Sequence, residues 1–265
     1  MDAEELLEGG NVSDSVVRIG RTVRKPWMDS TPSVFEFMTA VRKAGVDVPA
    51  VLGQDEQGRQ ITEFIPGRLA LGSDPLTHTE FHRVGAMVRA IHDASEAFVP
   101  PRDARWAAAI PSPGEEFVCH NDLAPWNLII GDRWTFIDWD GAAPSTRLWD
   151  LAYAAQAFTL SDTNQAPEEA AQNLAAFITG YDADRRLREE LPEAMSQRAA
   201  AMYSLLESSH AAGREPWGSM FVEGHGDHWR EATKYAHRHQ DLWSRALLTE
   251  PVPQSTTGGR TALEP

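Results

Sequence analysis

The sequence predicts an α+β protein with two lobes, a small antiparallel sheet that carries one helix and then a larger, mainly helical part. Short apolar segments bounded by turn residues fill most of residues 1–66, which is typical of strands. Pro66-Gly67 then interrupts the chain, and apolar residues recur at helical spacing over most of the remaining sequence. We therefore expect lobes at residues 1–66 and 67–250. Residues 251–265, rich in Pro, Gly, Ser and Thr, are expected to be disordered.

The composition excludes several function classes. The chain has 265 residues, 42% of them hydrophobic, so it can bury a sizeable core. A formal net charge of −15 disfavours nucleic acid and anionic membrane surfaces as partners and favours a cationic substrate, although solubility alone would also explain it. Cys119 is the single cysteine, and neither a leader nor a membrane-spanning segment is recognisable, so we expect a cytoplasmic protein.

The first lobe is predicted from its turn residues. Val16–Ile19 and Thr22–Lys25 form two strands joined by Gly20-Arg21, because glycine at the first turn position suits a type II′ hairpin. A helix is predicted over Pro32–Ala44, with Thr31 as its N-cap and Gly45 as its stop. Two further strands complete the lobe: Ala50–Leu52 and Ile61–Ile65.

The second lobe opens with a helix over Glu80–Glu96, whose apolar residues fall on one face. Three short apolar runs separated by turn residues then predict strands at Glu116–Cys119, Asn127–Ile130 and Trp134–Ile137. From Leu148 onward the pattern is helical. We expect helix breaks near Gly180, Pro192, Gly213–Gly218 and Gly224–Gly226.

The chemistry is concentrated between these strands. His120-x-Asp122-x-x-x-x-Asn127 has the spacing of a kinase catalytic loop, and Asp138 ends an apolar strand shortly downstream. Asp122 could accept the proton of an attacking hydroxyl. The amide oxygen of Asn127 and the carboxylate of Asp138 are the oxygen ligands that Mg²⁺ prefers. The pattern therefore predicts phosphoryl transfer from a nucleoside triphosphate. His120 is expected to support the loop rather than react.

Several segments together resemble the aminoglycoside phosphotransferase and choline kinase family. They are His120–Asn127 and Ile137–Asp140 above all, with Arg147–Ala152, Glu63–Gly67 and Ala90–His92. The resemblance implies a two-lobed protein-kinase-like fold with ATP or GTP in the cleft. It implies Asp122 as catalytic base, Asn127 and Asp138 as Mg²⁺ ligands, and Asp150 as an acid that braces the catalytic loop.

A kinase also needs a cation for the α- and β-phosphates. Lys25 is the first choice because it shares a strand face with Val23, while Arg24 points the other way and remains the alternative. Such a lysine usually pairs with a helix glutamate. Glu36 is the only acid in the predicted helix, but the resemblance places the position nearer Val34, so Glu36 could equally be a surface residue.

Three further residues are expected at the nucleotide. Gly10, in Gly9-Gly10, would let backbone N–H groups approach the triphosphate. Glu63 and Ile65, at the predicted link between lobes, would offer backbone groups to the nucleobase edge, although a buried strand would look the same.

The acceptor site is expected among the C-terminal helices. Acids that could contact a cationic acceptor are Asp140, Glu207, Glu223 and Asp227; Trp217, Phe221 and Trp229 could wall the cleft. Helix-surface or core positions would give the same pattern, and for Asp140 a turn cap is preferred.

The leading hypothesis is phosphorylation of a hydroxyl on a small cationic molecule such as an aminoglycoside, with antibiotic resistance as an implied role. The alternatives are a housekeeping kinase for an amino alcohol or sugar, and a nucleotide-binding pseudokinase scaffold. The protein is expected to act as a monomer or homodimer.

Overall fold

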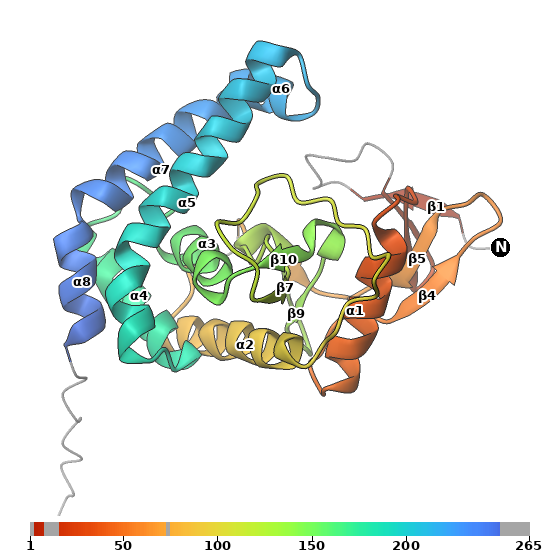
Figure 1. The fold of residues 1–265 in the computed structure, drawn as a ribbon, viewed down its shortest axis with the longest axis horizontal. Helices are drawn as coiled ribbons and strands as arrows, with labels where there is room; N and C mark the ends of the chain where they lie inside the picture. Colours follow the sequence, from red (N-terminus) through yellow and green to blue (C-terminus); the bar gives the residue numbers. More distant parts are fainter. Residues whose placement is uncertain (1–2, 8–15, 73–74, 250–265) are drawn as a thin grey trace, which may run out of the picture.

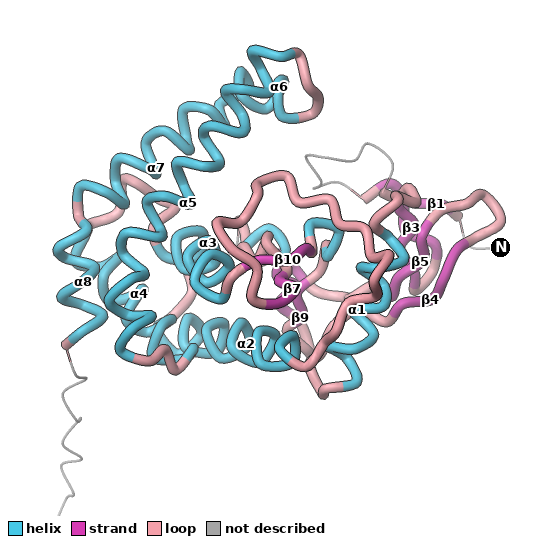
Figure 2. The backbone as a smooth tube through the Cα atoms, in the orientation of Figure 1, coloured by secondary structure: helices cyan, strands magenta, loops and turns pink. Residues whose placement is uncertain are grey.

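The computed structural model describes residues 3–7, 16–72 and 75–249, and it has the two-lobed α+β arrangement expected from the sequence (Figures 1 and 2). An antiparallel sheet in the order β1-β2-β3-β5-β4 forms the small lobe at one end. Helices make up most of the larger part. The strands of this sheet are β1 (Glu4–Leu6), β2 (Val17–Ile19), β3 (Thr22–Lys25), β4 (Val51–Gln54) and β5 (Gln60–Glu63).

The β2–β3 hairpin forms where the turn residues predict it. Gly20 has φ +58, a left-handed value that glycine adopts without steric cost. The hairpin aligns Val17 with Arg24. β3 then pairs with β5 in a register that puts Lys25 opposite Gln60. This pairing carries Lys25 to the end of the sheet that faces the larger lobe.

The helix α1 (Thr31–Lys43) packs against both lobes through a buried face of Val34, Phe37, Met38 and Val41. Its N-cap is Ser30, so the prediction of Thr31 as the cap is wrong by one residue. The Thr31 hydroxyl accepts a hydrogen bond from the Met28 N–H at 2.9 Å, and this bond fixes the chain entering the helix instead.

Two small sheets hold the predicted chemical segments. The first pairs β6 (Arg68–Leu69), β8 (Leu128–Ile130) and β9 (Thr135–Phe136), and the second pairs β7 (Phe117–Cys119) with β10 (Ala143–Ser145). The link between the lobes lies on the first of them. A Cβ on Gly67, whose φ is +152, would come within 2.6 Å of the Ile130 carbonyl oxygen. Glycine is therefore required where the chain leaves the small lobe.

Seven helices form the rest of the described second lobe. They are α2 (His78–Glu96), α3 (Arg147–Thr159), α4 (Pro167–Tyr181), α5 (Arg185–Ala212), α6 (Trp217–Met220), α7 (Gly226–Arg238) and α8 (Gln240–Leu248). In Figure 1, α5 and α7 run side by side as an arm with α6 at its tip. None of the described helices is long and apolar enough to cross a membrane.

The helix breaks follow the glycines but not Pro192. The expected break at Pro192 is wrong, because this residue lies inside α5 and is buried. α4 runs through Gly180 and ends at Tyr181. Near Gly224 the helix is interrupted by one π-helical turn over Phe221–His225, in which Gly224 has φ +107. Glycine tolerates that value, so the turn can form without ending the arm.

Candidate active site

The loop between β7 and η1 (Pro125–Asn127) is held by Asn121. This residue has φ +64, a value that asparagine adopts more readily than most residues. Its side-chain amide donates to the carbonyl oxygens of Gly141 and Ala143, each at 3.2 Å, and its backbone N–H donates to Asp150 at 2.9 Å. The loop is thereby tied to the chain that follows Asp138.

Asp122 and Asn127 face each other across the loop. The Asn127 amide donates to the Asp122 carboxylate at 2.7 Å and to the Asp122 carbonyl oxygen at 3.0 Å. Burial raises the pKa of the Asp122 carboxyl, and the Asp138 charge adds to the rise, while hydrogen bonds from Asn127 and Tyr153 oppose it. Asp122 is half-buried, so part of the residue remains open to solvent.

Lys25 joins the two lobes at this point. Its ammonium group lies 2.5 Å from Asp138 and 2.6 Å from Asp140. Burial alone would lower the pKa of Lys25, but the two carboxylates outweigh it and raise the pKa. Burial alone would raise the pKa of Asp138, but the charge and hydrogen bond of Lys25 outweigh burial and lower the pKa. Both groups are therefore charged near neutral pH.

The donor atoms fit a hard divalent cation. The Asn127 amide nitrogen is used by Asp122, whereas its oxygen accepts no hydrogen bond within the described residues. Lys25 contacts the Oδ1 atom of Asp138. The Asn127 oxygen is thus available, and the Asp138 carboxylate, which also accepts from the Asp140 N–H, keeps lone pairs beyond these bonds. Amide and carboxylate oxygens are the ligands that Mg²⁺ takes in proteins.

A buried network supports the loop from behind. His120 is fully buried; its Nε2 lies 3.1 Å from the Ile137 carbonyl oxygen, and its Nδ1 accepts from the Asp122 N–H at 3.2 Å. These partners require a proton on Nε2, and burial lowers the pKa of His120, so the ring is neutral. Asp150 accepts from the Asn121 N–H and lies 3.0 Å from His92 Nε2.

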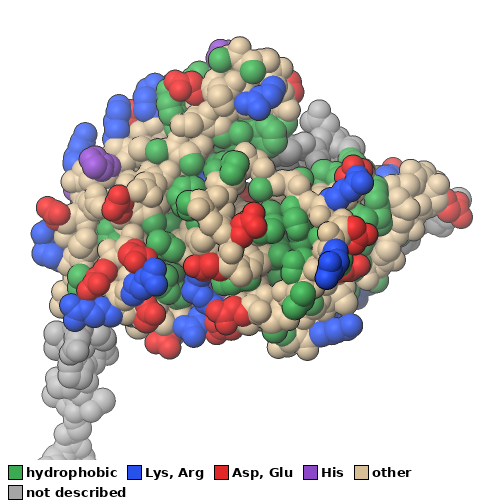
Figure 3. Space-filling model, viewed as in Figure 1, with side chains coloured by type: hydrophobic (Ala, Val, Ile, Leu, Met, Phe, Trp, Pro, Cys, Tyr) green, Lys and Arg blue, Asp and Glu red, His purple; other side chains and the backbone are tan. Residues whose placement is uncertain are grey.

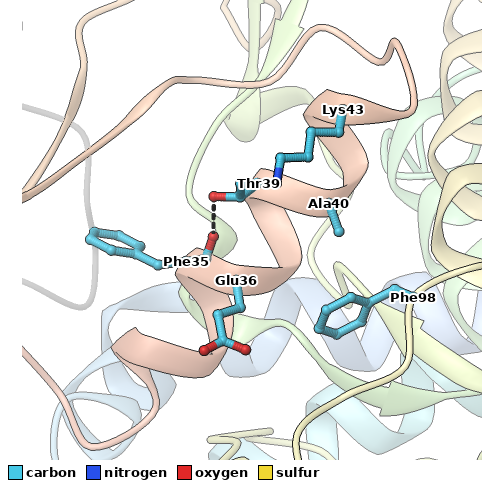
Figure 4. A pocket seen from close by; sticks show the side chains of 6 residues that line it. All are labelled: Phe35, Glu36, Thr39, Ala40, Lys43 and Phe98. Atoms are coloured by element: carbon cyan, nitrogen blue, oxygen red, sulfur yellow. Dashed lines mark hydrogen bonds between the residues drawn. The ribbon is translucent and has the colours of Figure 1, made fainter.

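The Lys25–Glu36 ion pair that the sequence left open is not formed. Glu36 is exposed and borders a surface hollow of about 380 Å³ on the outer side of α1, beside Thr39, Lys43 and Phe98 (Figure 4). Positions 34 and 36 lie on different sides of a helix, and Val34 is the one that points inward. Lys25 takes Asp138 and Asp140 as its acid partners instead.

The three other residues predicted at the nucleotide, Gly10, Glu63 and Ile65, have different surroundings. Gly10 lies outside the described residues. The Glu63 side chain bonds Arg133 at 2.5 Å and the Ala50 N–H at 3.1 Å, and its own N–H donates to the Ala50 carbonyl. Ile65 is buried and makes no hydrogen bond within the described residues, so its backbone groups are free for another partner.

The four predicted acceptor acids do not all gather at one place, although Glu207 and Asp227 both lie close enough to Tyr203 to raise its pKa. Asp140 pairs with Lys25 and accepts from the buried Gln60 at 3.2 Å. Glu207 accepts from the Tyr203 hydroxyl at 2.8 Å, and Asp227 pairs with Arg230 at 2.9 Å. Glu223 is exposed in the π-helical turn. Only Asp140 lies at the chemical centre.

The structure adds two residues that sequence reasoning missed. Tyr153, on α3, donates from its hydroxyl to Asp122 and is almost fully buried. Arg198, on α5, lies with its guanidinium carbon 4.1 Å above the Tyr153 ring and donates to the Asn121 carbonyl oxygen at 3.4 Å. Residues so far apart in sequence carry no shared local signal, so only the packing of α3 against α5 brings them to the loop.

A family model matches the segment that contains this loop. Residues 102–191 match the model of a family described as "Phosphotransferase enzyme family". Over 163 residues the chain is 31% identical to the trifolitoxin immunity protein of Rhizobium leguminosarum bv. trifolii, a match that covers 58% of this chain and 61% of the relative. The chain thus spans less than two thirds of that relative's length. The predicted resemblance to aminoglycoside phosphotransferases and choline kinases is confirmed.

Solved structures share the fold over most of the chain. A microcompartment-associated aminopropanol kinase is 14% identical with a TM-score of 0.61 and coverage of 92% of this chain and 94% of its own. A choline/ethanolamine kinase family protein from Mesorhizobium loti is 16% identical with a TM-score of 0.58, and the match covers 92% of this chain and 92% of its own. Amicoumacin kinase in complex with AMP-PNP, Ca²⁺ and Ami is 10% identical with a TM-score of 0.62, and the match covers 90% of this chain and 88% of its own. The two-lobed fold predicted from the sequence is confirmed.

Proposed function

We propose that the protein is a small-molecule kinase that moves the γ-phosphoryl group of ATP or GTP to a hydroxyl, with Mg²⁺ as cofactor. One observation carries the proposal. Within the segment that matches the phosphotransferase family, Asp122, Asn127 and Asp138 converge on the point that Lys25 reaches from the other lobe. Oxygen ligands, an acid to accept a proton and a cation for phosphate are the parts that phosphoryl transfer requires.

Each residue has a distinct task in this proposal. Asp122 accepts the proton of the acceptor hydroxyl. The hydroxyl oxygen then bonds to the γ-phosphorus, and the bond from this phosphorus to the oxygen of the leaving nucleoside diphosphate breaks. Asn127 and Asp138 would hold Mg²⁺, which supplies charge neutralisation at the phosphates when bound. Lys25, held between Asp138 and Asp140, provides the cation for the α- and β-phosphates. Asp150 and His120 keep the loop in place.

The nucleotide would lie between residues 1–66 and the rest of the chain. The single linking segment at Gly67 supports this division, because its close contact with Ile130 fixes the small lobe against the catalytic strands. Ile65 would offer its free backbone groups to the base. We keep a cytoplasmic location and a monomer or homodimer as part of the proposal.

For the acceptor, we propose a small hydroxyl-bearing molecule. The sequence favours a cation such as an aminoglycoside, and the named relative, an immunity protein, supports a protective role. An amino alcohol is the second candidate, favoured by the fold shared with aminopropanol and choline/ethanolamine kinases. A pseudokinase scaffold is disfavoured, because the three chemical residues are all present.

The test is phosphoryl transfer from ATP or GTP, with and without Mg²⁺, to aminoglycosides, other antibiotics, amino alcohols and sugars, detected by mass. Asp122→Asn should abolish transfer and keep nucleotide binding, whereas Asp138→Asn should lose the Mg²⁺-dependent part of nucleotide affinity. Asp132→Asn is the matched control, since Asp132 is an exposed acid in the turn between β8 and β9. Failure of the unaltered protein to bind either nucleotide with Mg²⁺ would refute the proposal.

A further inference from the structure

Lys25 and Gln60 are neighbours on the small lobe and bond to the same carboxylate. β3 and β5 pair with Lys25 directly opposite Gln60, so their side chains stand on one face of the sheet with Cβ atoms about 4.5–5.5 Å apart. The Lys25 ammonium group lies 2.6 Å from Oδ2 of Asp140, and the Gln60 amide donates to Oδ1 of Asp140 at 3.2 Å. Both oxygens of Asp140 therefore have a partner on the small lobe.

Gln60 is itself held in place. Its side chain is buried, and its amide nitrogen also donates to the Pro26 carbonyl oxygen at 3.1 Å. The two N–H groups of one amide thus bond Asp140 and the residue that follows Lys25. Because a buried donor that loses its partner costs free energy, this amide has little freedom to turn away. Gln60 therefore fixes Asp140 relative to the strand that carries Lys25.

The turn that carries Asp140 is supported from below. Asp140 lies in the 3₁₀ turn η2 (Trp139–Gly141), where Trp139 is buried and donates from Nε1 to the Phe136 carbonyl oxygen at 3.0 Å. The Trp139 ring meets the Phe37 ring of α1 edge to face, with centroids 5.6 Å apart. α1 thus contributes an apolar support to the turn, and the position of Asp140 is set from both lobes.

Glu36, the exposed acid of α1, does not reach this point. It lies on the outer side of the helix (Figure 4), and Figure 3 shows acidic and basic side chains interspersed over this region of the surface. Asp138 contacts Lys25 at 2.5 Å, but in the proposed function Mg²⁺ draws on the same carboxylate. Two cations that share one carboxylate repel each other. A kinase lysine is held at the phosphates by an acid, so an acid other than Asp138 is required.

We infer that Asp140, fixed by Gln60, positions Lys25 at the nucleotide phosphates and takes the place of the helix glutamate that other kinases use. Asp140 and Gln60 act through Lys25, so both are positioning residues rather than catalytic ones. The inference rests on the proposed kinase function, and it assigns Asp140 to the nucleotide rather than to the acceptor. α1 then supports the site through packing instead of charge.

Phosphorus NMR of bound AMP-PNP with Mg²⁺ tests the position of Lys25 without any acceptor. The β-phosphorus resonance is sensitive to a nearby cation, so Lys25→Met gives the reference shift. Asp140→Asn and Gln60→Leu remove the bonds with little change in size, and we expect both to move the resonance in the same direction as Lys25→Met. Gln54→Leu is the matched control, because Gln54 is an exposed glutamine on β4 whose amide donates to the Gly58 carbonyl oxygen at 3.0 Å. This control should leave the resonance unchanged.

Turnover of ATP, by transfer to an acceptor or by hydrolysis, gives a second readout. Asp140→Asn and Gln60→Leu should each lower kcat roughly tenfold and change the KM for ATP much less, because misplaced phosphates still bind but react slowly. Asp140→Glu keeps an acid and should restore part of kcat. A lower melting temperature in thermal unfolding with an unchanged resonance and kcat would show a role in stability alone and overturn the inference.

Double variants distinguish this role from metal binding. On the Lys25→Met background, Asp140→Asn and Gln60→Leu should move the β-phosphorus resonance no further, because both act through Lys25. If Asp140→Asn raises the Mg²⁺ concentration needed for nucleotide binding on that background, Asp140 is a metal ligand and the inference is overturned. Equal shifts with and without Lys25 would overturn it as well.

These outcomes separate this inference from the function on which it rests. If the unaltered protein binds nucleotide with Mg²⁺ and transfers phosphate, but Asp140→Asn and Gln60→Leu behave like Gln54→Leu, only the positioning role is refuted. Failure of the unaltered protein to bind nucleotide with Mg²⁺ would refute the kinase proposal and the inference with it.

Discussion

Replacing Asp150 should be among the most damaging single changes outside the proposed reacting groups. Its side chain is fully buried, and its two oxygens take the Asn121 N–H at 2.9 Å and His92 Nε2 at 3.0 Å. His92 in turn accepts from the Tyr181 hydroxyl at 2.7 Å, so its ring cannot turn to another partner. Asp150→Ala would leave two buried donors without acceptors.

The expected cost follows from these bonds. A hydrogen bond to a charged group contributes about 1.5–3 kcal/mol. Asp150 accepts two such bonds, so we expect Asp150→Ala to lower the free energy of unfolding by about 3–6 kcal/mol. Asp150→Asn keeps one acceptor oxygen and should cost about half as much. Transfer activity should fall in both, because Asn121 adjoins Asp122.

Urea unfolding followed by circular dichroism measures this cost. Asp29→Ala is the matched control, since the Asp29–Arg105 pair is equally short, at 2.9 Å, but its side chains are 86% and 70% exposed. An exposed pair contributes less than about 1 kcal/mol. If Asp150→Ala costs no more than Asp29→Ala, then the network does not hold the catalytic loop and the reasoning fails.

Two further changes probe packing and charge. Gly180→Ala should destabilise by about 1–3 kcal/mol or more in thermal unfolding, because its Cβ would lie 1.9 Å from the His82 carbonyl oxygen where α2 crosses α4; an unchanged melting temperature would contradict this contact. Partial burial alone would raise the pKa of Glu63, but bonds from Arg133 and Ala50 outweigh it and lower the pKa from 4.5. The resulting stabilisation is complete above pH 4.5 and is lost as the pH falls through the lower pKa that Glu63 has in the folded protein. Arg133→Ala should therefore weaken the dependence of the free energy of unfolding on pH in acid solution. The same pH dependence in both proteins would refute this link.

The local elements were predictable because their signals are local. Turn glycines, a helix face at 3.6-residue spacing and short apolar runs gave the β2–β3 hairpin, α1, α2 and β7 with boundaries close to those observed. Pro192 misled, because proline is normally a helix breaker, yet α5 packs tightly enough on its neighbours to continue through it. Tertiary packing there outweighs the local preference.

The candidate site was predictable to the same extent. The spacing of Asp122, Asn127 and Asp138 fixes them on one loop and the adjoining strand end, and strand alternation gave the face of Lys25. The partner of Lys25 was not predictable. Whether Glu36 reaches it depends on the rotation of α1 about its axis, which the core contacts of Val34 and Phe37 set.

The sequence by itself determined the two-lobed fold and the groups available for chemistry, since both depend on short-range pattern and spacing. Only the tertiary structure decided the surroundings of those groups. The cation of Arg198 above Tyr153, the brace from His92 through Asp150, and the ring of Phe221 on Gly226 all join residues that are distant along the chain or depend on an irregular turn. Such contacts depend on how helices pack, and helix packing is a property of the whole core rather than of any one segment.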